Sequence, residues 1–150
     1  MARDIMREIS AHIDDYNDES YFHEKEKDAN LAEFFSGKAG GTSEIYDALE
    51  EALQKDGKVT LSSSVIKEIE KHIDDYNDEV LFNKRQGNEL QADFYSGKSS
   101  ACVEILDELK SSLEGKMIDK NGEIVPDKQK TFSLKPKIGR VDTDRENDGR

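Results

Sequence analysis

Apolar residues recur at intervals of three and four through most of residues 5–113, the spacing that places side chains on one face of a helix. The pattern is interrupted by short polar breaks, so it predicts four amphipathic helices in two consecutive pairs. The first helix of each pair carries the stripe Ile5, Ile9, Ile13, Tyr16 or Val65, Ile69, Ile73, Tyr76, Val80. The second carries Leu31, Phe34, Phe35, Thr42, Ile45, Leu49, Leu53 or Phe94, Tyr95, Cys102, Ile105, Leu109, Leu113.

Residues that cap helices stand where these stripes begin. Asp4 and Ser64 precede the first helix of each pair, and Asp28 and Asn88 precede the second. Their side-chain oxygens can accept a hydrogen bond from an unpaired amide of the first turn. Gly87 is a typical helix stop in the second pair. We therefore expect two antiparallel helical hairpins with tight connections, each opening with a helix of about twenty residues.

The two hairpins are copies of one another. Residues 5–54 and 65–114 agree at 21 of 50 positions when they are aligned without gaps at an offset of 60. The octapeptide HIDDYNDE occurs at 12–19 and again at 72–79, and the second helices share F-x-S-G-K and E-I-x-D-x-L. Such regular self-similarity indicates an internal duplication.

Three glycines fall within SGKAGG at 36–41, and each costs a helix interior about 1 kcal/mol relative to alanine. We expect one long second helix in both copies all the same, with a kink in the first copy or a break that exposes Lys38 as the alternatives. Gly37 and Gly97 would let helices approach closely.

The expected fold is all-α, with two tandem antiparallel helical hairpins that resemble a four-helix bundle or pair across a dimer interface. We divide the chain into a first hairpin repeat (1–54), a polar linker (55–64), a second hairpin repeat (65–115) and a C-terminal arm (116–150). The arm has an Asn-Gly turn between two apolar pairs, which suggests a β-hairpin or an extended segment. From 127 to 150 the sequence is polar and almost without periodicity, so we expect partial disorder there.

Charge narrows the range of partners. The net charge is −12, and residues 1–115 hold 27 acidic and 13 basic side chains, a net −14. This composition disfavours direct binding to nucleic acid or to an anionic membrane, because both need clustered Lys and Arg. With one cysteine and no long apolar run, nothing indicates secretion or a membrane span. We expect a cytoplasmic protein.

One polar line runs beside the apolar stripe of each first helix. Its members fall within roughly 60° on a helical wheel, and they are Glu8, His12, Asp15, Glu19 and Glu68, His72, Asp75, Glu79. Histidine between carboxylates could bind a divalent metal or act as an acid–base pair if a second helix supplied further ligands. We favour the simpler interpretation of a boundary line, because transition-metal sites on helices usually show more than one His.

Asp14 and Asp18, with Asp74 and Asp78, project away from the apolar stripe. A solvated helix face is the simple interpretation. The alternative is a row of carboxylates that imitates nucleic-acid phosphates and occupies a basic groove on a partner protein. The candidate partner-binding residues are Asp14, Asp15, Asp18, Glu19, Asp74, Asp75, Asp78 and Glu79.

The spacings Glu44-x-x-Asp47 and Glu104-x-x-Asp107, with Asp15-x-x-Asp18 and Asp75-x-x-Asp78 on the first helices, resemble the all-α nucleotide pyrophosphatases of the MazG and dimeric dUTPase type. That resemblance implies magnesium held by these carboxylates. Two departures count against it: Asp replaces Glu in the first pair, and a helical wheel turns the second pair away from the apolar seam, where the carboxylates would have to converge.

Lys38 and Lys98 fall inside the apolar stripe of the second helices. We expect each stem to lie along the seam, with the ammonium reaching outward or pairing with the acidic line of the first helix. Gly97-Lys98-Ser99 resembles the end of a phosphate-binding loop but lacks the preceding strand, and the first copy reads GKA. The tail sequence at 142–149 ends too early for a calcium loop. Cys102 lies on the core stripe, so a buried thiol is expected rather than a nucleophile.

The F-x-S-G-K and E-I-x-D-x-L pattern of the second helices resembles the small acidic helical-hairpin proteins of phages and mobile elements of Gram-positive bacteria. The resemblance implies a host-interacting protein, often an inhibitor of a host or defence enzyme, which would act in the host cytoplasm if a phage encodes it. We therefore expect a non-enzymatic protein that needs no cofactor and binds the basic surface of another protein. A metal-dependent nucleotide hydrolase and a homo-oligomeric scaffold, for example a homodimer, are the alternatives.

Overall fold

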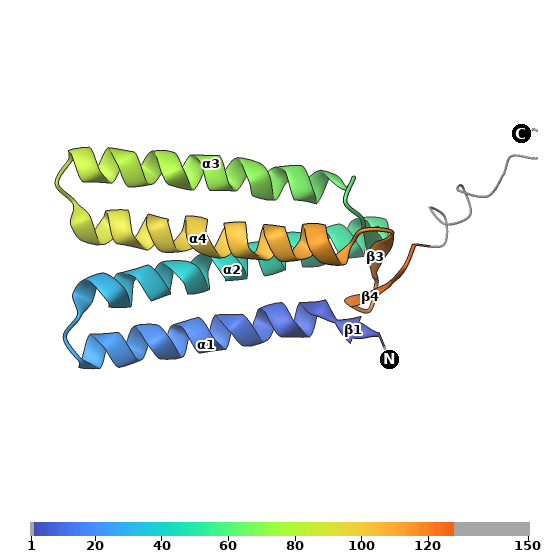
Figure 1. Ribbon diagram of the computed structural model, residues 1–150, viewed down its shortest axis with the longest axis horizontal. Coiled ribbons are helices and arrows are strands. Elements are labelled where there is room, and N and C mark those ends of the chain that lie inside the picture. The colour runs from blue at the N-terminus through green and yellow to red at the C-terminus, as the bar shows by residue number, and fades with distance from the viewer. Residues whose placement is uncertain (1, 128–150) are drawn as a thin grey trace, which may run out of the picture.

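The computed structural model describes residues 2–127 and is mostly helical, as the periodicity predicts (Figure 1). Its four helices follow the predicted order and approximate bounds: α1 (Ile5–Lys25), α2 (Ala29–Asp56), α3 (Ser64–Arg85) and α4 (Glu89–Ser112). Helix α2 continues without interruption through Gly37–Gly41, so the expectation of one long second helix is confirmed and the alternative break is not found.

The aspartate caps form as predicted, whereas the other two positions differ. Asp4 accepts a hydrogen bond from the Arg7 amide, and Asp28 accepts one from the Leu31 amide. Ser64 is already helical and its neighbour Ser63 is the N-cap, but the Ser63 hydroxyl accepts a bond from the preceding Thr60 amide instead of from the helix. Asn88 is the N-cap of α4 without a side-chain bond to it.

The two helix–helix turns have the same backbone shape and different residues. Gly87 lies in the left-handed region with a φ of 72°, which glycine adopts without steric cost. The equivalent residue of the first turn is Lys27, with a φ of 63°. A side chain with a Cβ is strained in this region, so the first turn contains a local destabilising element that the second turn lacks.

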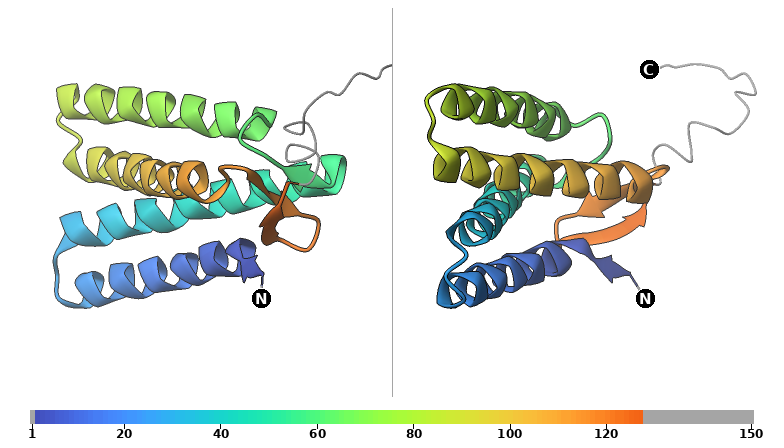
Figure 2. Two further views of the ribbon diagram at one scale, coloured as in Figure 1. Left: turned by 45° about the vertical axis from the view of Figure 1, so that its right-hand side comes forward. Right: turned by 60° about the vertical axis from the view of Figure 1, so that its left-hand side comes forward.

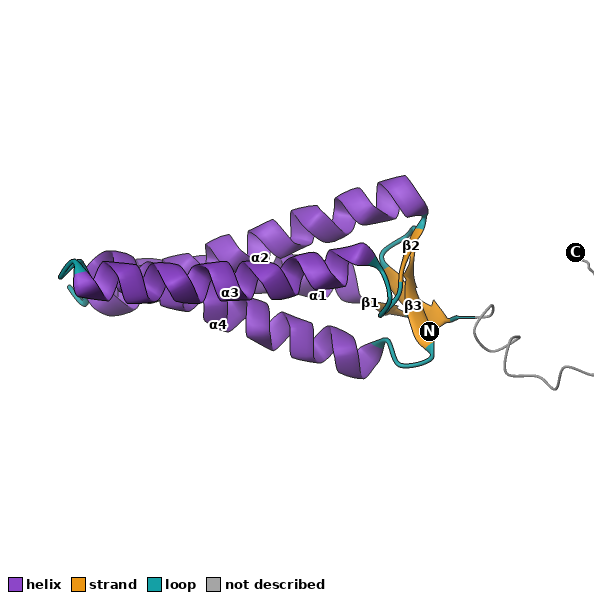
Figure 3. Ribbon diagram, turned by 90° about the horizontal axis from the view of Figure 1, so that it is seen from above, coloured by secondary structure: helices purple, strands orange, loops and turns teal. Residues whose placement is uncertain are grey.

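Helices α2 and α4 form the centre of the molecule and make its most extensive contact. Helix α1 packs along α2, and α3 packs along α4, so α1 and α3 lie at opposite edges (Figures 1 and 2). Seen from above, α2 and α4 cross and spread apart toward the strands (Figure 3). The space between them at that end must therefore be filled by other elements.

The hydrophobic core fills this wider end. It takes residues from the beginning of α1 and α3 and from the end of α2 and α4, together with the strands. Leu49, Ile69, Leu109 and Ile118 are completely buried. Toward the turns the stripe of α1 becomes only half-buried at Ile13 and Tyr16.

A small sheet closes the core at the wide end. Its order is β1 (Arg3–Asp4), β4 (Glu123–Pro126), β3 (Lys116–Asp119), β2 (Lys58–Val59), and all neighbours are antiparallel. Of the two alternatives for the C-terminal arm, the structure has the β-hairpin and not the extended segment, whereas β1 and β2 were not predicted. The interval 55–64 is thus more than a polar linker, since it adds a strand in which Val59 is fully buried.

The predicted Asn-Gly turn connects β3 to β4. Gly122 has a φ of 83°, and Asp119 accepts hydrogen bonds from the amides of Asn121 and Glu123. The Met6 amide donates to the Gly122 carbonyl at 3.3 Å, which attaches the turn to the start of α1. The predicted disordered tail, apart from residue 127, lies outside the described residues.

Candidate functional site

The acidic rows of the octapeptides lie on the outer helices α1 and α3. Asp14, Asp15 and Asp18 are exposed, as are their equivalents Asp74, Asp75 and Asp78. Glu19 is also exposed, and its carboxylate is 3.5 Å from the His23 Nε2. Because α2 and α4 lie between α1 and α3, the two rows occupy opposite edges of the molecule (Figure 2).

Residues of the motifs repeated in the two second helices contact one another where α2 packs on α4. The Lys38 ammonium of α2 is 3.1 Å from the Glu104 Oε2 of α4. The Tyr16 hydroxyl, from α1, donates to the other oxygen of the same carboxylate at 3.2 Å. Three identical positions of the duplicated sequence thus combine into one polar cluster that joins the two halves.

The same cluster occurs a second time with the halves exchanged. The Lys98 ammonium is 2.6 Å from the Glu44 Oε2, and the Tyr76 hydroxyl donates to the Glu44 carboxylate. Each half therefore supplies the lysine and tyrosine of one cluster and the glutamate of the other. Two reciprocal ion pairs hold α2 to α4 in a fixed register.

Aromatic rings surround both lysines. The Lys38 ammonium is 4.9, 5.6 and 6.0 Å from the ring centres of Tyr16, Phe34 and Phe35. Around Lys98 the distances to Tyr76, Phe94 and Tyr95 are 5.0, 5.4 and 5.9 Å. The Lys38 and Lys98 side chains are only 12 and 13 % exposed, so each ammonium loses most of its hydration. The attraction of the ring faces for a cation and the charge of the paired carboxylate offset this loss.

These clusters correct two expectations. The lysines pair with glutamates on the second helix of the opposite half, and not with the acidic line of a first helix. Glu44 and Glu104 lie beside the helix seam, although the helical wheel placed them away from it. The wheel was wrong because it considered one helix at a time, whereas the seam is set by how α2 crosses α4.

The carboxylates that the nucleotide-pyrophosphatase resemblance assigns to magnesium do not gather at one point. Asp47 and Asp107 are exposed, and Glu44 and Glu104 are bound by separate lysines. Within residues 2–127 no group of three or more His, Cys, Asp or Glu side chains is arranged to hold a metal ion. The alternative metal line of Glu8, His12, Glu68 and His72 is likewise distributed over α1 and α3, on opposite sides of the molecule.

The histidines of the octapeptides have a packing role. The His12 ring stacks on Tyr16 with ring centres 6.0 Å apart, and the His72 ring stacks on Tyr76 at 5.9 Å. Each histidine therefore covers the tyrosine that donates to a cluster glutamate. His12 is exposed and His72 is half-buried, and within the described residues neither side chain has a hydrogen bond to its acidic neighbours.

A groove of about 220 Å³ runs between α1 and α4. Its floor is apolar, and at one end Arg3 joins Glu8 at 2.7 Å to Glu108 at 2.8 Å. Hydrogen bonds from the Arg3 guanidinium lower the pKa of both carboxyls, and the same bonds raise the pKa of Arg3. Arg3 therefore fastens α1 to α4, an interaction that the sequence analysis did not anticipate.

At the other end of this groove, burial raises the pKa of Tyr16 to about 12, with a smaller contribution from the Glu104 carboxylate. The phenol accordingly keeps its proton at neutral pH and donates a hydrogen bond to Glu104. Burial also raises the pKa of Cys102 to about 12, so the thiol remains protonated and unreactive, as expected from its position on the core stripe.

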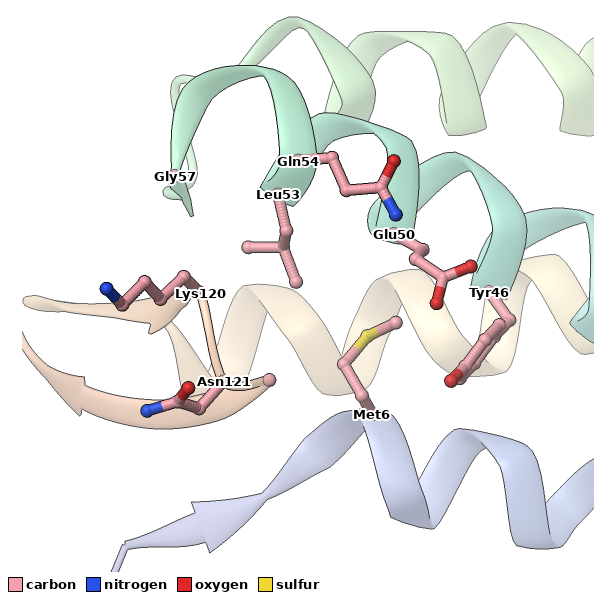
Figure 4. A pocket seen from close by; sticks show the side chains of 9 residues that line it. Met6, Tyr46, Glu50, Leu53, Gln54, Gly57, Lys120 and Asn121 are labelled. Carbon is pink, nitrogen blue, oxygen red and sulfur yellow. The ribbon is translucent and has the colours of Figure 1, made fainter.

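A wider, more open pocket of about 460 Å³ lies between α2, the β3–β4 turn and the start of α1 (Figure 4). Met6 and Leu53 form its apolar base, and Tyr46, Glu50 and Lys120 stand around it. No nucleophile paired with a base is found among its lining residues, which are Met6, Tyr46, Glu50, Leu53, Gln54, Gly57, Lys120, Asn121 and Gly122.

None of the helices within residues 2–127 is both long and apolar enough to cross a bilayer. Comparison with protein-family models, curated proteins and solved structures finds no match to this chain.

Proposed function

We propose that this protein is a non-enzymatic binding module whose acidic rows engage a basic surface on another protein. The observation that carries the proposal concerns Asp14, Asp18, Asp74 and Asp78. All four are exposed, and within the described residues none has a hydrogen bond or an ion pair through its side chain. These four side chains therefore do not hold the helices of the described residues together.

Other repeated acidic residues are used differently. Glu44 and Glu104 bind the buried lysines, and Glu8 binds Arg3. Packing therefore accounts for their presence, whereas it does not account for two identical rows of free carboxylates. A row of fixed negative charges raises the association rate of a basic partner and favours its correct orientation.

The proposal regards α1–α2 and α3–α4 as two tandem antiparallel hairpins, each presenting one row. Basic nucleic-acid-binding grooves are suitable partners, because carboxylates spaced along a helix can replace phosphates. Binding there would exclude nucleic acid, so the protein would act as an inhibitor. Membership of the phage or mobile-element hairpin proteins, and a place in the cytoplasm, are parts of the same proposal.

The test compares two variants with equal net charge. In the first, Asp14, Asp18, Asp74 and Asp78 are changed to Asn. In the control, four exposed acidic residues of α2 and α4 are neutralised instead: Asp47→Asn, Glu50→Gln, Glu51→Gln and Asp107→Asn. Each immobilised protein is incubated with cell extract, and the bound proteins are quantified by mass spectrometry at low and high salt.

We expect the wild type and the control to retain the same basic proteins, and the row variant to lose them. Binding should also weaken as salt rises, because exposed charges are screened beyond about 10 Å at 0.1 M salt. Equal recovery by the row variant and the control would show that position along the helix is irrelevant, and the proposal would then fail.

A further inference from the structure

Exposed apolar side chains gather at the end of the molecule that lacks the sheet. Seven large apolar side chains are exposed within residues 2–127, and all but Val103 lie at or beside the two helix–helix turns. Phe22 is 55 % exposed, and its equivalent Phe82 is 54 % exposed. We call this set the tip surface, and it consists of Tyr21, Phe22, Leu31, Leu81, Phe82 and Leu90.

The two turns lie side by side at one end of the molecule (Figures 1 and 2). A hydrogen bond of 2.5 Å from the Asn30 amide group to the Asp93 carboxylate joins the beginning of α2 to the beginning of α4. Sheet strands cover the core at the opposite end, but no described element covers the tip surface. Exposed apolar groups of this size at one place indicate a contact surface.

Charge distinguishes the two turns from the rest of the chain and from each other. Residues 21–31 carry three acidic and two basic side chains, a net −1, whereas residues 81–91 carry one acidic and two basic, a net +1. The two turns together are neutral, so the net −14 of residues 1–115 lies entirely elsewhere. The difference is sharpest at one aligned position, where the first turn has Glu24 and the second has Lys84.

These features favour a second copy of this chain as the occupant. Two copies repel each other over their acidic helix faces, and this repulsion is smallest at the neutral turns. If the first turn of each copy faces the second turn of the other, the contact contains two pairs of turns. In each pair, a turn with a net charge of −1 faces a turn with a net charge of +1. The arrangement is reciprocal, as is usual for homodimers with two-fold symmetry.

We propose that the protein forms a tip-to-tip homodimer in which the first turn of each copy packs on the second turn of the other. Phe22 and Phe82 supply the apolar centre of the contact, and Glu24 lies opposite Lys84 of the second copy. The acidic rows on α1 and α3 remain free in this dimer, so it is independent of the function proposed above.

The test measures the mass of the full chain by sedimentation velocity from about 1 µM to about 1 mM, a range that detects dissociation constants between these two concentrations. We expect a monomer–dimer equilibrium for the wild type. The double variant Phe22→Ser/Phe82→Ser should dissociate at least about tenfold more readily, because apolar centres dominate binding. Val103→Ser, which removes an exposed apolar group on α4 away from the turns, should leave the equilibrium unchanged.

Charge exchange tests the orientation. Glu24→Lys places like charges opposite one another at two points of the dimer and should weaken it roughly two- to fivefold at each. Adding Lys84→Glu to the same chain should restore the wild-type equilibrium. A wild-type protein that is monomeric throughout the range overturns the proposal. So does a dimer that the phenylalanine variant leaves intact, or one that the second charge change does not restore.

Discussion

Gly37 of α2 lies so close to Phe94 of α4 that no side chain fits between the two helices. A Cβ atom on Gly37 would be 1.9 Å from the Phe94 carbonyl oxygen, and a Cβ atom on Gly97 would be 1.9 Å from the Phe34 carbonyl oxygen. The contact is therefore reciprocal between the halves. It brings the helices near enough for Lys38 and Lys98 to reach the opposite glutamates.

Replacing Gly37 by Ala should destabilise the fold by about 1–3 kcal/mol, because the backbones must move apart and the packing around them is strained. The free energy of unfolding, measured by urea denaturation followed by circular dichroism, checks this. Gly97→Ala should have the same effect, since its surroundings are equivalent.

Gly40→Ala is the matched control on the same helix. A Cβ there would meet the flexible end of the Lys98 side chain at 3.4 Å and the Phe94 ring at 3.9 Å, both side-chain contacts, so alanine should fit. Alanine also favours the helical backbone, and the variant should be more stable than the wild type by up to about 1 kcal/mol. A destabilisation equal to that of Gly37→Ala would show that close approach is not the cause.

The Lys38–Glu104 pair should be energetically coupled. The Lys38 side chain is only 12 % exposed, and Glu104→Gln leaves its ammonium without a negatively charged partner. A double-mutant cycle with Lys38→Met and Glu104→Gln should give a coupling free energy of about 1 kcal/mol. Its magnitude is limited because the Glu104 carboxylate is 52 % exposed and remains hydrated.

The Lys110–Glu70 pair supplies the control for this cycle. Its atoms are also 3.1 Å apart, but both side chains are about half exposed, with values of 52 and 45 %. We expect a smaller coupling there, on the order of 0.3 kcal/mol. Equal couplings for the two pairs would contradict a special role for the aromatic surroundings of Lys38.

Lys27→Gly should stabilise the protein. Lys27 has a φ of 63°, where a Cβ is strained, and glycine removes this strain at the cost of a more flexible unfolded chain. We expect a gain of about 0.5–1 kcal/mol in the free energy of unfolding, the difference between the strain removed and the added freedom of the unfolded chain. Lys25→Gly is the control, because Lys25 is the last helical residue of α1 and the same substitution there relieves no strain. This variant should lower the free energy of unfolding.

Arg3 should make stability depend on acidic pH. Its hydrogen bonds lower the pKa of Glu8 and Glu108 in the folded chain below their ordinary value of 4.5. The resulting stabilisation is therefore complete above about pH 4.5 and is lost as the pH falls through the lowered values. Unfolding midpoints measured between about pH 7 and pH 2 check this.

In Arg3→Gln this part of the acid dependence should disappear, so that wild type and variant differ at neutral pH and converge in acid. Arg7→Gln removes the same charge from the next turn, where no ion pair through the Arg7 side chain forms among residues 2–127. That control should keep the wild-type pH dependence. A constant difference between wild type and Arg3→Gln over the whole range would refute the assignment to Glu8 and Glu108.

The candidate site was only partly predictable. The sequence located Asp14 and Asp18 on an exposed helix face, because exposure on one helix follows from its own periodicity. It also indicated that Lys38 lies on the apolar stripe. It did not indicate that Glu104 is its partner, since these residues are 66 positions apart and belong to different helices.

By itself, the sequence determined the four helices, two of their caps, the Asn-Gly turn and the duplication. These features depend on contacts within a few residues, which periodicity and turn residues express directly. Tertiary structure alone decided that Arg3–Asp4 and Lys58–Val59 become strands, since two-residue segments have no periodicity and form only where β4 and β3 offer free edges. It also decided which lysine meets which glutamate, because the crossing of α2 and α4 at Gly37 and Gly97 sets the distance between halves.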